Sequence, residues 1–325
     1  MSGKHAALPK RMRKIMDLAH NLPPIPMAVV DAGEDHVLAG AHEAAQAGLI
    51  EPTLIGRRRD IEAVCNGLGF ANDRYPIIEA ESDAEAAEQG VQRVLEGQAA
   101  ALMKGWIHTD VLMHPVLARL RTARRVSHVF VVELASYHKL LLVTDAAINI
   151  APDLMTKAAI VQNAVDLARL LGIEMPKVAA LSAVEVVKPA ITSTIDAACL
   201  SKMAQRGQIR HAIVDGPLAF DNAISKDAAR TKHIDSPVAG EVDILLAPDL
   251  ASGNILAKDL EYLAAATMAG IVVGARVPIV LPSRSDPPAA RLASSAIAVV
   301  VHHHWHGDTA TTPGREAPLS HPSAQ

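Results

Sequence analysis

The sequence predicts an α/β fold in which helices cover both faces of a mixed, mostly parallel sheet. Apolar runs of strand length alternate with longer segments of helical period through most of the 325 residues. Half of the chain is apolar but only 2% is aromatic, so the core consists mainly of Ala, Val, Leu and Ile, which suit the packing of helices on a sheet. Residues 126–134 and 140–150 are apolar runs separated only by residues 135–139, which predicts a hairpin and therefore a mixed sheet.

The first half of the chain starts this alternation with a helix over residues 34–49. The elements expected after it are a strand at 52–56, a helix at 59–69, a strand at 75–80, a helix at 83–96, a strand at 100–105 and a helix from Thr109. Ser82 and Glu85 form a capping box at the start of the third of these helices. Thr109 is the expected N-cap of the last one.

The hairpin is followed by a long helix over residues 152–172, with Asp153 near its start and Gly172 at its end. The later elements are a strand at 177–185, a helix at 192–207 capped by Thr192 or Ser193, strands at 211–220, 242–250, 269–275 and 277–284, and a helix from about residue 288. From Val301 the periodicity is lost, so residues 306–325 are expected to form a disordered tail. The run from His302 to His306 lies at this point and is expected to bind metal only adventitiously, so no metal site is predicted.

Composition and charge exclude several classes of function. The net charge is −4 and the pI is near 6.4, which argues against a nucleic-acid partner. No apolar run approaches the roughly 18 residues of a membrane span, and the N-terminus lacks the apolar core of a signal peptide. Cys65 and Cys199 lie far apart in the sequence, which is typical of a reduced, cytoplasmic protein.

Polar residues and glycines follow the ends of several expected strands. The pairs are Lys104-Gly105, Thr144-Asp145, Asp215-Gly216, Pro248-Asp249 and Ser283-Arg284. If the strands run parallel, these ends lie at one edge of the sheet and define a ligand-binding cleft, whereas the alternative is ordinary turn chemistry. Gly253 and Asn254, just after one strand end, are interpreted as a turn that lets the backbone approach a ligand closely.

Residues 281–293 carry the most informative of these strand ends. Arg284 can bind a phosphate or carboxylate with two hydrogen bonds, Ser283 can donate one, and Asp286 can accept a proton. The helix from residue 288 would direct its N-terminal N–H groups at the same point. The alternative is a capped helix start with Arg284 in solvent. Lys104, Gly105 and Thr109 offer a second possible phosphate cradle, although no Walker-type or dinucleotide-binding glycine motif is present.

Several segments together resemble the phosphate acetyl/butyryltransferase family, and in particular the transacylase half of bifunctional enoyl-CoA hydratase/phosphate acetyltransferases and the phosphate butyryltransferases. They are "ALMKG", "VTDAAINIAPD", "VQNAVDLARLLGIEMPKVAALSAVE", "MAQRGQI", "VDGPLAFDNAIS", "SPVAGEVDILLAPDLASGNILAK" and "AGIVVGARVPIVLPSRSD". The likeness covers about residues 20 to 300, in the same order along the chain.

This resemblance implies a reversible reaction in which an acyl-CoA and inorganic phosphate give an acyl phosphate and CoA, with no metal or redox cofactor. It implies two three-layer α/β/α domains with an interdomain cleft, as in isocitrate and isopropylmalate dehydrogenases, and a homodimer. The expected domains are residues 1–145 plus 276–305 and residues 146–275. The resemblance assigns Arg284 to the phosphate, Ser283 to a hydrogen bond near the reacting carbonyl, and Asp286 to proton transfer from the CoA thiol. The expected substrate-binding residues are Lys104, Gly105, Thr109, Asp145, Asn149, Asp215, Asp221, Gly253 and Asn254.

The sequence departs from the family at two places. Acetyltransferase members carry an acid a few residues farther along, where this chain has residues 287–290, so Asp286 is the only acid in that loop. Trp106 and His108 stand where butyryltransferase-like members tend to have small polar residues, which leaves the acyl chain open between acetyl and butyryl. A non-catalytic acyl-CoA or phosphate-binding protein and a metal- and NAD-dependent decarboxylating dehydrogenase on the same fold are the alternatives.

Overall fold

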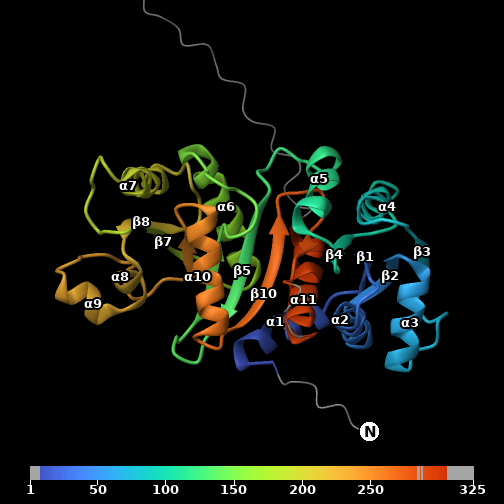
Figure 1. Cartoon of the computed structure of the whole chain (residues 1–325). Helices are drawn as coiled ribbons and strands as arrows, with labels where there is room; N and C mark the ends of the chain where they lie inside the picture. Colours follow the sequence, from blue (N-terminus) through green and yellow to red (C-terminus); the bar gives the residue numbers. More distant parts are fainter. Residues whose placement is uncertain (1–7, 284–285, 287, 306–325) are drawn as a thin grey trace, which may run out of the picture.

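The computed structural model describes residues 8–283, 286 and 288–305, and in these residues the chain forms one continuous eleven-stranded sheet with helices on both faces (Figure 1). The order across the sheet is β3-β2-β1-β4-β11-β10-β5-β6-β9-β7-β8. The strands are β1 (Ile25–Val30), β2 (Ile50–Gly56), β3 (Ile77–Glu79), β4 (Ala101–Lys104), β5 (Ser127–Glu133), β6 (Leu140–Thr144), β7 (Lys177–Leu181), β8 (Ile213–Leu218), β9 (Ile244–Leu246), β10 (Thr267–Val273) and β11 (Ile279–Val280).

The direction of the strands reverses at the centre of the sheet, at β5 and β10. β5 pairs antiparallel with both β6 and β10, and β10 pairs antiparallel with β11, while all other neighbours are parallel. Figure 1 shows the arrows of β5 and β10 side by side and pointing in opposite directions. The strands β1, β2, β3, β4 and β11 therefore end at one edge of the sheet, and β6, β7, β8 and β9 end at the opposite edge. We call these two sides, at which the strands end, the first edge and the second edge; the terms do not refer to the outermost strands.

The helices form a layer on each face of the sheet. They are α1 (Lys10–His20), α2 (Asp35–Gln46), α3 (Arg58–Leu68), α4 (Asp83–Leu95), α5 (Thr109–Arg119), α6 (Leu154–Leu170), α7 (Thr192–Gln205), α8 (Phe220–Ile224), α9 (Lys226–Thr231), α10 (Leu250–Tyr262) and α11 (Pro288–Trp305). One face carries α1, α2, α3, α6, α7 and α11 in a single apolar core. On the other face, α4 and α5 cover the half around β1 and β4, and α8, α9 and α10 cover the half around β6 and β9, with separate cores.

The predicted α/β class, the mixed sheet and the hairpin of β5 and β6 are confirmed. The division into two domains stays a prediction, because the sheet itself runs without a break across both proposed halves. Strand β1 and helix α1 were not anticipated from the sequence. Residues 302–305 are the last turn of α11 rather than part of an irregular tail, and the predicted tail itself lies outside the described residues.

The helix caps agree with the sequence in part. Asp153 caps α6 by accepting from the Thr156 N–H at 2.7 Å, as expected. Ser82 accepts from the Glu85 N–H, but the Glu85 carboxylate accepts from the N–H of Glu81 rather than from that of Ser82. The predicted caps of α5 and α7 are wrong, because Thr109 and Thr192 are already the first helical residues. In the described part of the chain, no helix has the length and hydrophobicity needed to cross a membrane.

Candidate active site

The loop between β11 and α11 holds two of the three residues predicted to be catalytic in a fixed arrangement. The Ser283 N–H donates to Asp286 Oδ2 at 2.8 Å, and the Asp286 N–H donates back to the Ser283 carbonyl at 3.2 Å. These reciprocal bonds form a tight turn that buries Asp286 to 6% exposure. Arg284, the predicted phosphate ligand, lies outside the described residues.

Arg291 anchors this loop from inside the protein. Its side chain is fully buried, and its guanidinium donates to the Asp286 carbonyl at 3.1 Å, with a longer contact of 3.5 Å to the Ser283 carbonyl. The stem of Arg291 lies against α2 at Gly40, where a Cβ would come within 2.6 Å of Arg291 Cδ, so only glycine leaves room for it. Burial lowers the pKa of Arg291, and the carboxylates of Asp286 and Glu34 oppose that change.

The carboxyl of Asp286 has a pKa suited to proton transfer near neutrality. Burial raises its pKa to about 6, and the carboxylate of Glu261 also raises it, whereas the Ser283 N–H and the ammonium of Lys258 lower it. Glu261 and Lys258 form an ion pair at 2.6 Å on the last turn of α10, so this helix contributes both charges to the site. A carboxyl of this kind is mostly ionised at pH 7 yet basic enough to take a proton from a weak acid.

Lys104 and Gly105 lie at the same edge as this loop. β4 pairs with β11 through Leu102–Ile279 and Met103–Val280, so its end stands beside the start of the Ser283 turn. A Cβ on Gly105 would lie 2.0 Å from the Asp31 carbonyl, which explains the glycine. Lys104 is buried, and its ammonium offsets part of the rise that burial and Asp83 cause in the pKa of Asp31.

Thr109, the first residue of α5, follows β4 and lies at the same edge, whereas the other six predicted binding residues are not brought to this point. Asp145, Asn149, Asp221, Gly253 and Asn254 follow the ends of β6, β8 and β9, which lie at the second edge. Asp215 was predicted to stand at a strand end, but it lies inside β8. The expected convergence of all strand ends assumed parallel strands, and the reversal at β5 and β10 breaks that condition. Along α10 alone, the distance from Asp249 at the second edge to Glu261 at the first is about 18 Å.

At the second edge these polar groups hold backbone in place. The Asp145 carboxylate accepts from the N–H groups of Ala147 and Ile148 and from the Asn149 side chain. Asn254 donates its amide to the Ala146 carbonyl at 3.2 Å. The Gly253-Asn254 turn is a wrong prediction, because both residues lie inside α10 and the Gly253 N–H donates to the Asp249 carbonyl.

Asp215 and Asp221 are engaged with nearer groups. Asp215 accepts from the Gly216 N–H at 2.8 Å. Asp221 on α8 pairs with Lys232 at 3.1 Å, and the hydrogen bond from Lys232 lowers the pKa of Asp221. Substrate binding by the residues of the second edge stays a prediction.

Sequence reasoning missed Arg291, Lys258 and Glu261, although Arg291 is a lone cation in an apolar helix, which is a signal of a buried structural charge.

The comparisons with known proteins agree on one family. The family model described as phosphate acetyl/butaryl transferase matches residues 83–299. The chain is 51% identical to a phosphate acetyltransferase of Rickettsia typhi over 289 residues, which covers 88% of this chain and 83% of the relative. It is 39% identical to a phosphate butyryltransferase of Clostridium acetobutylicum over 278 residues, covering 85% and 92%.

Solved structures give the same result for the fold. A branched-chain phosphotransacylase from Enterococcus faecalis superposes with a TM-score of 0.74 at 31% identity, covering 86% of this chain and 99% of that one. A phosphotransacetylase from Streptococcus pyogenes gives a TM-score of 0.76 at 24% identity, covering 91% and 99%, and so shares the fold. The predicted family and fold are both confirmed.

Proposed function

The chain belongs to the phosphate acetyl/butaryl transferase family, and we propose that the loop between β11 and α11 carries its chemistry. The protein is an acyltransferase that converts an acyl-CoA and inorganic phosphate into an acyl phosphate and CoA, and the reverse. We propose that the acyl group is acetyl or butyryl. The observation that supports the site is the buried carboxyl of Asp286, which the Ser283 N–H fixes and whose pKa is about 6.

Asp286 serves as the base when CoA attacks an acyl phosphate. A thiol with a pKa of about 8.5 is largely protonated at neutral pH and attacks slowly in that form. The Asp286 carboxylate takes the thiol proton as sulfur bonds to the carbonyl carbon, and the bond from that carbon to the phosphate oxygen then breaks. In the opposite direction phosphate attacks the thioester, the carbon–sulfur bond breaks, and protonated Asp286 returns its proton to the leaving sulfur.

The phosphate is held by positive charge at the first edge. Arg284 is the proposed ligand, since a guanidinium can donate two parallel hydrogen bonds to a phosphate. The start of α11 at Pro288 adds the partial positive charge of a helix N-terminus beside the same loop. The Ser283 hydroxyl is the proposed donor to the carbonyl oxygen as negative charge develops on it. Lys104 lies at the same edge and adds a second cation.

CoA and phosphate are the substrates, and we propose that the reaction uses no metal and no redox cofactor. In this proposal the carboxylate of Asp286 transfers the proton, and the cations Arg284 and Lys104 stabilise the negative charge. We also propose a cytoplasmic protein with neither a nucleic-acid nor a membrane partner. The net charge of −4 argues against nucleic acid as a partner.

We further propose that the chain forms a homodimer through the second edge. Large apolar side chains are exposed there, on the loop after β7 and on α7, α8 and α10: Val186, Val187, Ile195, Phe220 and Ile255. One of them, Phe220, also lines a cavity of about 760 Å³ together with Ser252 and Leu256. An apolar surface of this kind is typical of a protein–protein interface. Sedimentation of the native chain as a monomer would contradict this, as would an unchanged dimer after Phe220→Ser and Ile255→Ser.

The test of the function is release of free thiol from acetyl-CoA or butyryl-CoA in the presence of phosphate. Phosphate-dependent release with one of the two thioesters is the expected result. Arg284→Ala should raise the KM for phosphate at least tenfold while the fold is kept, because a charge-assisted pair of hydrogen bonds is lost. Binding of acyl-CoA without thiol release would instead indicate a non-catalytic binding protein, and NAD reduction with a hydroxy acid would indicate a dehydrogenase.

A further inference from the structure

A second basic site lies at the second edge, away from the Ser283–Asp286 loop. Three arginines, Arg121, Arg124 and Arg125, stand on the segment that joins α5 to β5. This segment and the start of α6 enclose a cavity of about 480 Å³, within the range of small-molecule sites. The proposed phosphotransacylase chemistry uses none of these residues.

The segment that carries the arginines is held in one conformation. Thr122 Oγ1 donates to the Gly274 carbonyl at 2.8 Å and accepts from the Arg124 N–H at 3.0 Å. Asn163, from the middle of α6, donates its amide to the Arg125 carbonyl at 2.6 Å. Gly274 has a φ of +89°, and a Cβ there would lie 2.1 Å from that same carbonyl, so the close approach requires glycine. The segment is therefore preorganised before any ligand binds.

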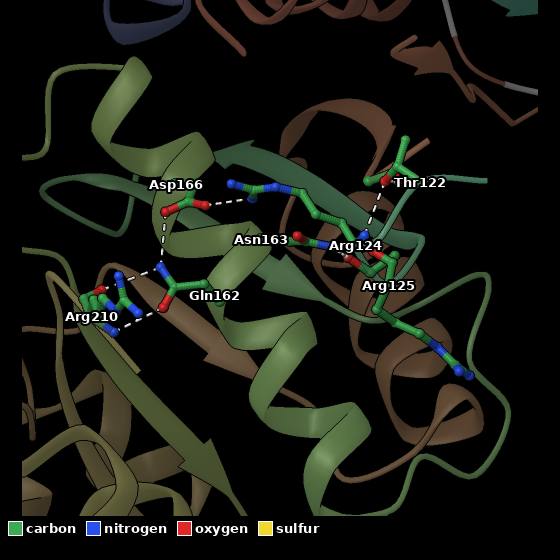
Figure 2. A network of polar contacts seen from close by, with 9 residues as sticks. Thr122, Arg124, Arg125, Gln162, Asn163, Asp166 and Arg210 are labelled. Atoms are coloured by element: carbon green, nitrogen blue, oxygen red, sulfur yellow. Dashed lines mark hydrogen bonds and ion pairs between the residues drawn. The ribbon is translucent and has the colours of Figure 1, made fainter. Parts of the chain in front are cut away.

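The three guanidinium groups have different surroundings. Arg124 forms an ion pair of 2.6 Å with Asp166 on α6, and Asp166 also accepts from Gln162 at 2.9 Å. Figure 2 shows Arg124 extending toward Asp166 while the side chain of Arg125 extends in another direction. The charge of Arg124 is thus neutralised, and the cavity is left with the other two arginines.

Arg125 is oriented by a buried side chain. Its Nε donates to Asn149 Oδ1 at 2.8 Å. Asn149 is only 5% exposed, and its amide donates to the Val126 carbonyl and to Asp145, which fixes its orientation. The terminal nitrogens of Arg125 and the whole guanidinium of Arg121 have no hydrogen-bond partner among the residues that the structure describes, and both side chains are exposed. They can donate to a ligand without breaking an existing bond.

Charge and geometry together select a class of ligand. Asp153 also lines the cavity, but its Oδ1 is already used to cap α6, so two arginines against one engaged carboxylate leave a net positive charge. Planar guanidinium groups with free donors match the oxygens of phosphates, and a multiply charged anion gains most from two of them. We propose that Arg121 and Arg125 form a binding site for a phosphorylated small molecule, recognised through a diphosphate or comparable phosphoester group.

Two sources can supply this chemistry. One is the phosphate-bearing end of CoA itself, and the other is a separate phosphorylated ligand. The two are distinguished by whether loss of the site changes the KM for acetyl-CoA.

The direct test is calorimetric titration of the whole chain with inorganic pyrophosphate in an Arg284→Ala background, which removes the arginine proposed to bind the reacting phosphate. We expect one binding event that Arg121→Gln with Arg125→Gln weakens at least tenfold, since hydrogen bonds between charged partners are lost. Arg169→Gln, an exposed arginine near the far end of α6, is the matched control and should change nothing. Absence of binding in the background chain, or equal affinity with and without the two arginines, would overturn the proposal.

Kinetic measurements on the double variant Arg121→Gln with Arg125→Gln, in which Arg284 is intact, then identify the source of the phosphate group. If the site holds the phosphates of CoA, the double substitution raises the KM for acetyl-CoA and leaves the KM for phosphate unchanged. If the ligand is separate, both constants stay as in the native chain although pyrophosphate binding is lost. Failure of the proposed function would appear differently, as absence of thiol release in the unsubstituted chain.

Discussion

Replacing Asp286 by Asn should make the protein more stable and less active at the same time. In the folded chain burial raises the pKa of Asp286 to about 6 from an ordinary value of 3.8. Below pH 3.8 both states hold the proton and no penalty exists. As pH rises from 3.8 to 6, the unfolded chain releases the proton while the folded chain keeps it, so stability falls. A difference of about 2 pKa units corresponds to about 3 kcal/mol, which persists above pH 6.

The amide introduced by Asp286→Asn carries no charge at any pH, so this penalty disappears in the variant. The assay is urea denaturation of both chains between pH 5 and 8. We expect Asp286→Asn to exceed the native chain by up to about 3 kcal/mol at pH 7–8, and the gap to narrow as pH falls below 6. Because the amide cannot take a proton, kcat should fall by about a hundredfold to ten-thousandfold.

Asp259→Asn is the matched control, since it removes an exposed carboxylate on the same helix, α10, that supplies Lys258 and Glu261 to the site. It should change neither stability nor kcat. The reasoning about Asp286 would be refuted by a stability gap that does not depend on pH, or by a variant less stable than the native chain at pH 8.

Three other properties of the chain can be tested in the same assays. In the direction from acyl phosphate to acyl-CoA, kcat should decrease as pH falls below about 6, because Asp286 must be ionised to take the thiol proton. In the opposite direction kcat should decrease as pH rises above about 6, because Asp286 must be protonated. The same pH profile of kcat in both directions would count against this role. Burial lowers the pKa of His128 to about 4, and the charge of Asp145 partly opposes this change. As pH falls from 6.5 to 4, the native chain should therefore lose up to about 3 kcal/mol of unfolding free energy relative to His128→Leu. A difference in urea midpoints that stays constant across that range would contradict this prediction. Gly105→Ala should destabilise the fold by about 3 kcal/mol because its Cβ would overlap the Asp31 carbonyl, whereas Gly67→Ala, in open space on α3, should be neutral or stabilising in the same denaturation assay.

The sequence was sufficient for most elements but not for their directions. Apolar runs predict the central strands well because these are buried, as in β5, where every residue is buried, whereas β3 at the end of the strand order has no fully buried residue. The hairpin of β5 and β6 was visible from the short connection between them. The effect of the central reversal on the location of strand ends was not, because it depends on which strands become neighbours after β10 returns between β5 and β11.

The candidate site could also be predicted from the sequence only in part. Ser283 and Asp286 could be selected from local chemistry, since a serine and a carboxylate stand just before a helix start. Arg291 could be recognised as a buried charge, but its contact with the loop could not be predicted, and neither could that of Glu261, because both arise only when α11 and α10 pack against the loop. The Gly253-Asn254 pair illustrates the opposite error: its position after a strand suggests a turn, but both residues lie inside α10.

The contact between Gly40 and Arg291 has a consequence for how this chain can vary. The two positions are far apart in sequence but interlock, since any side chain larger than hydrogen at position 40 would displace the arginine that anchors the reactive loop. A larger residue at position 40 therefore requires a smaller one at position 291, with loss of the hydrogen bond from Arg291 to the Asp286 carbonyl. A residue on α2, outside the loop itself, thus limits which side chains can anchor the loop from α11.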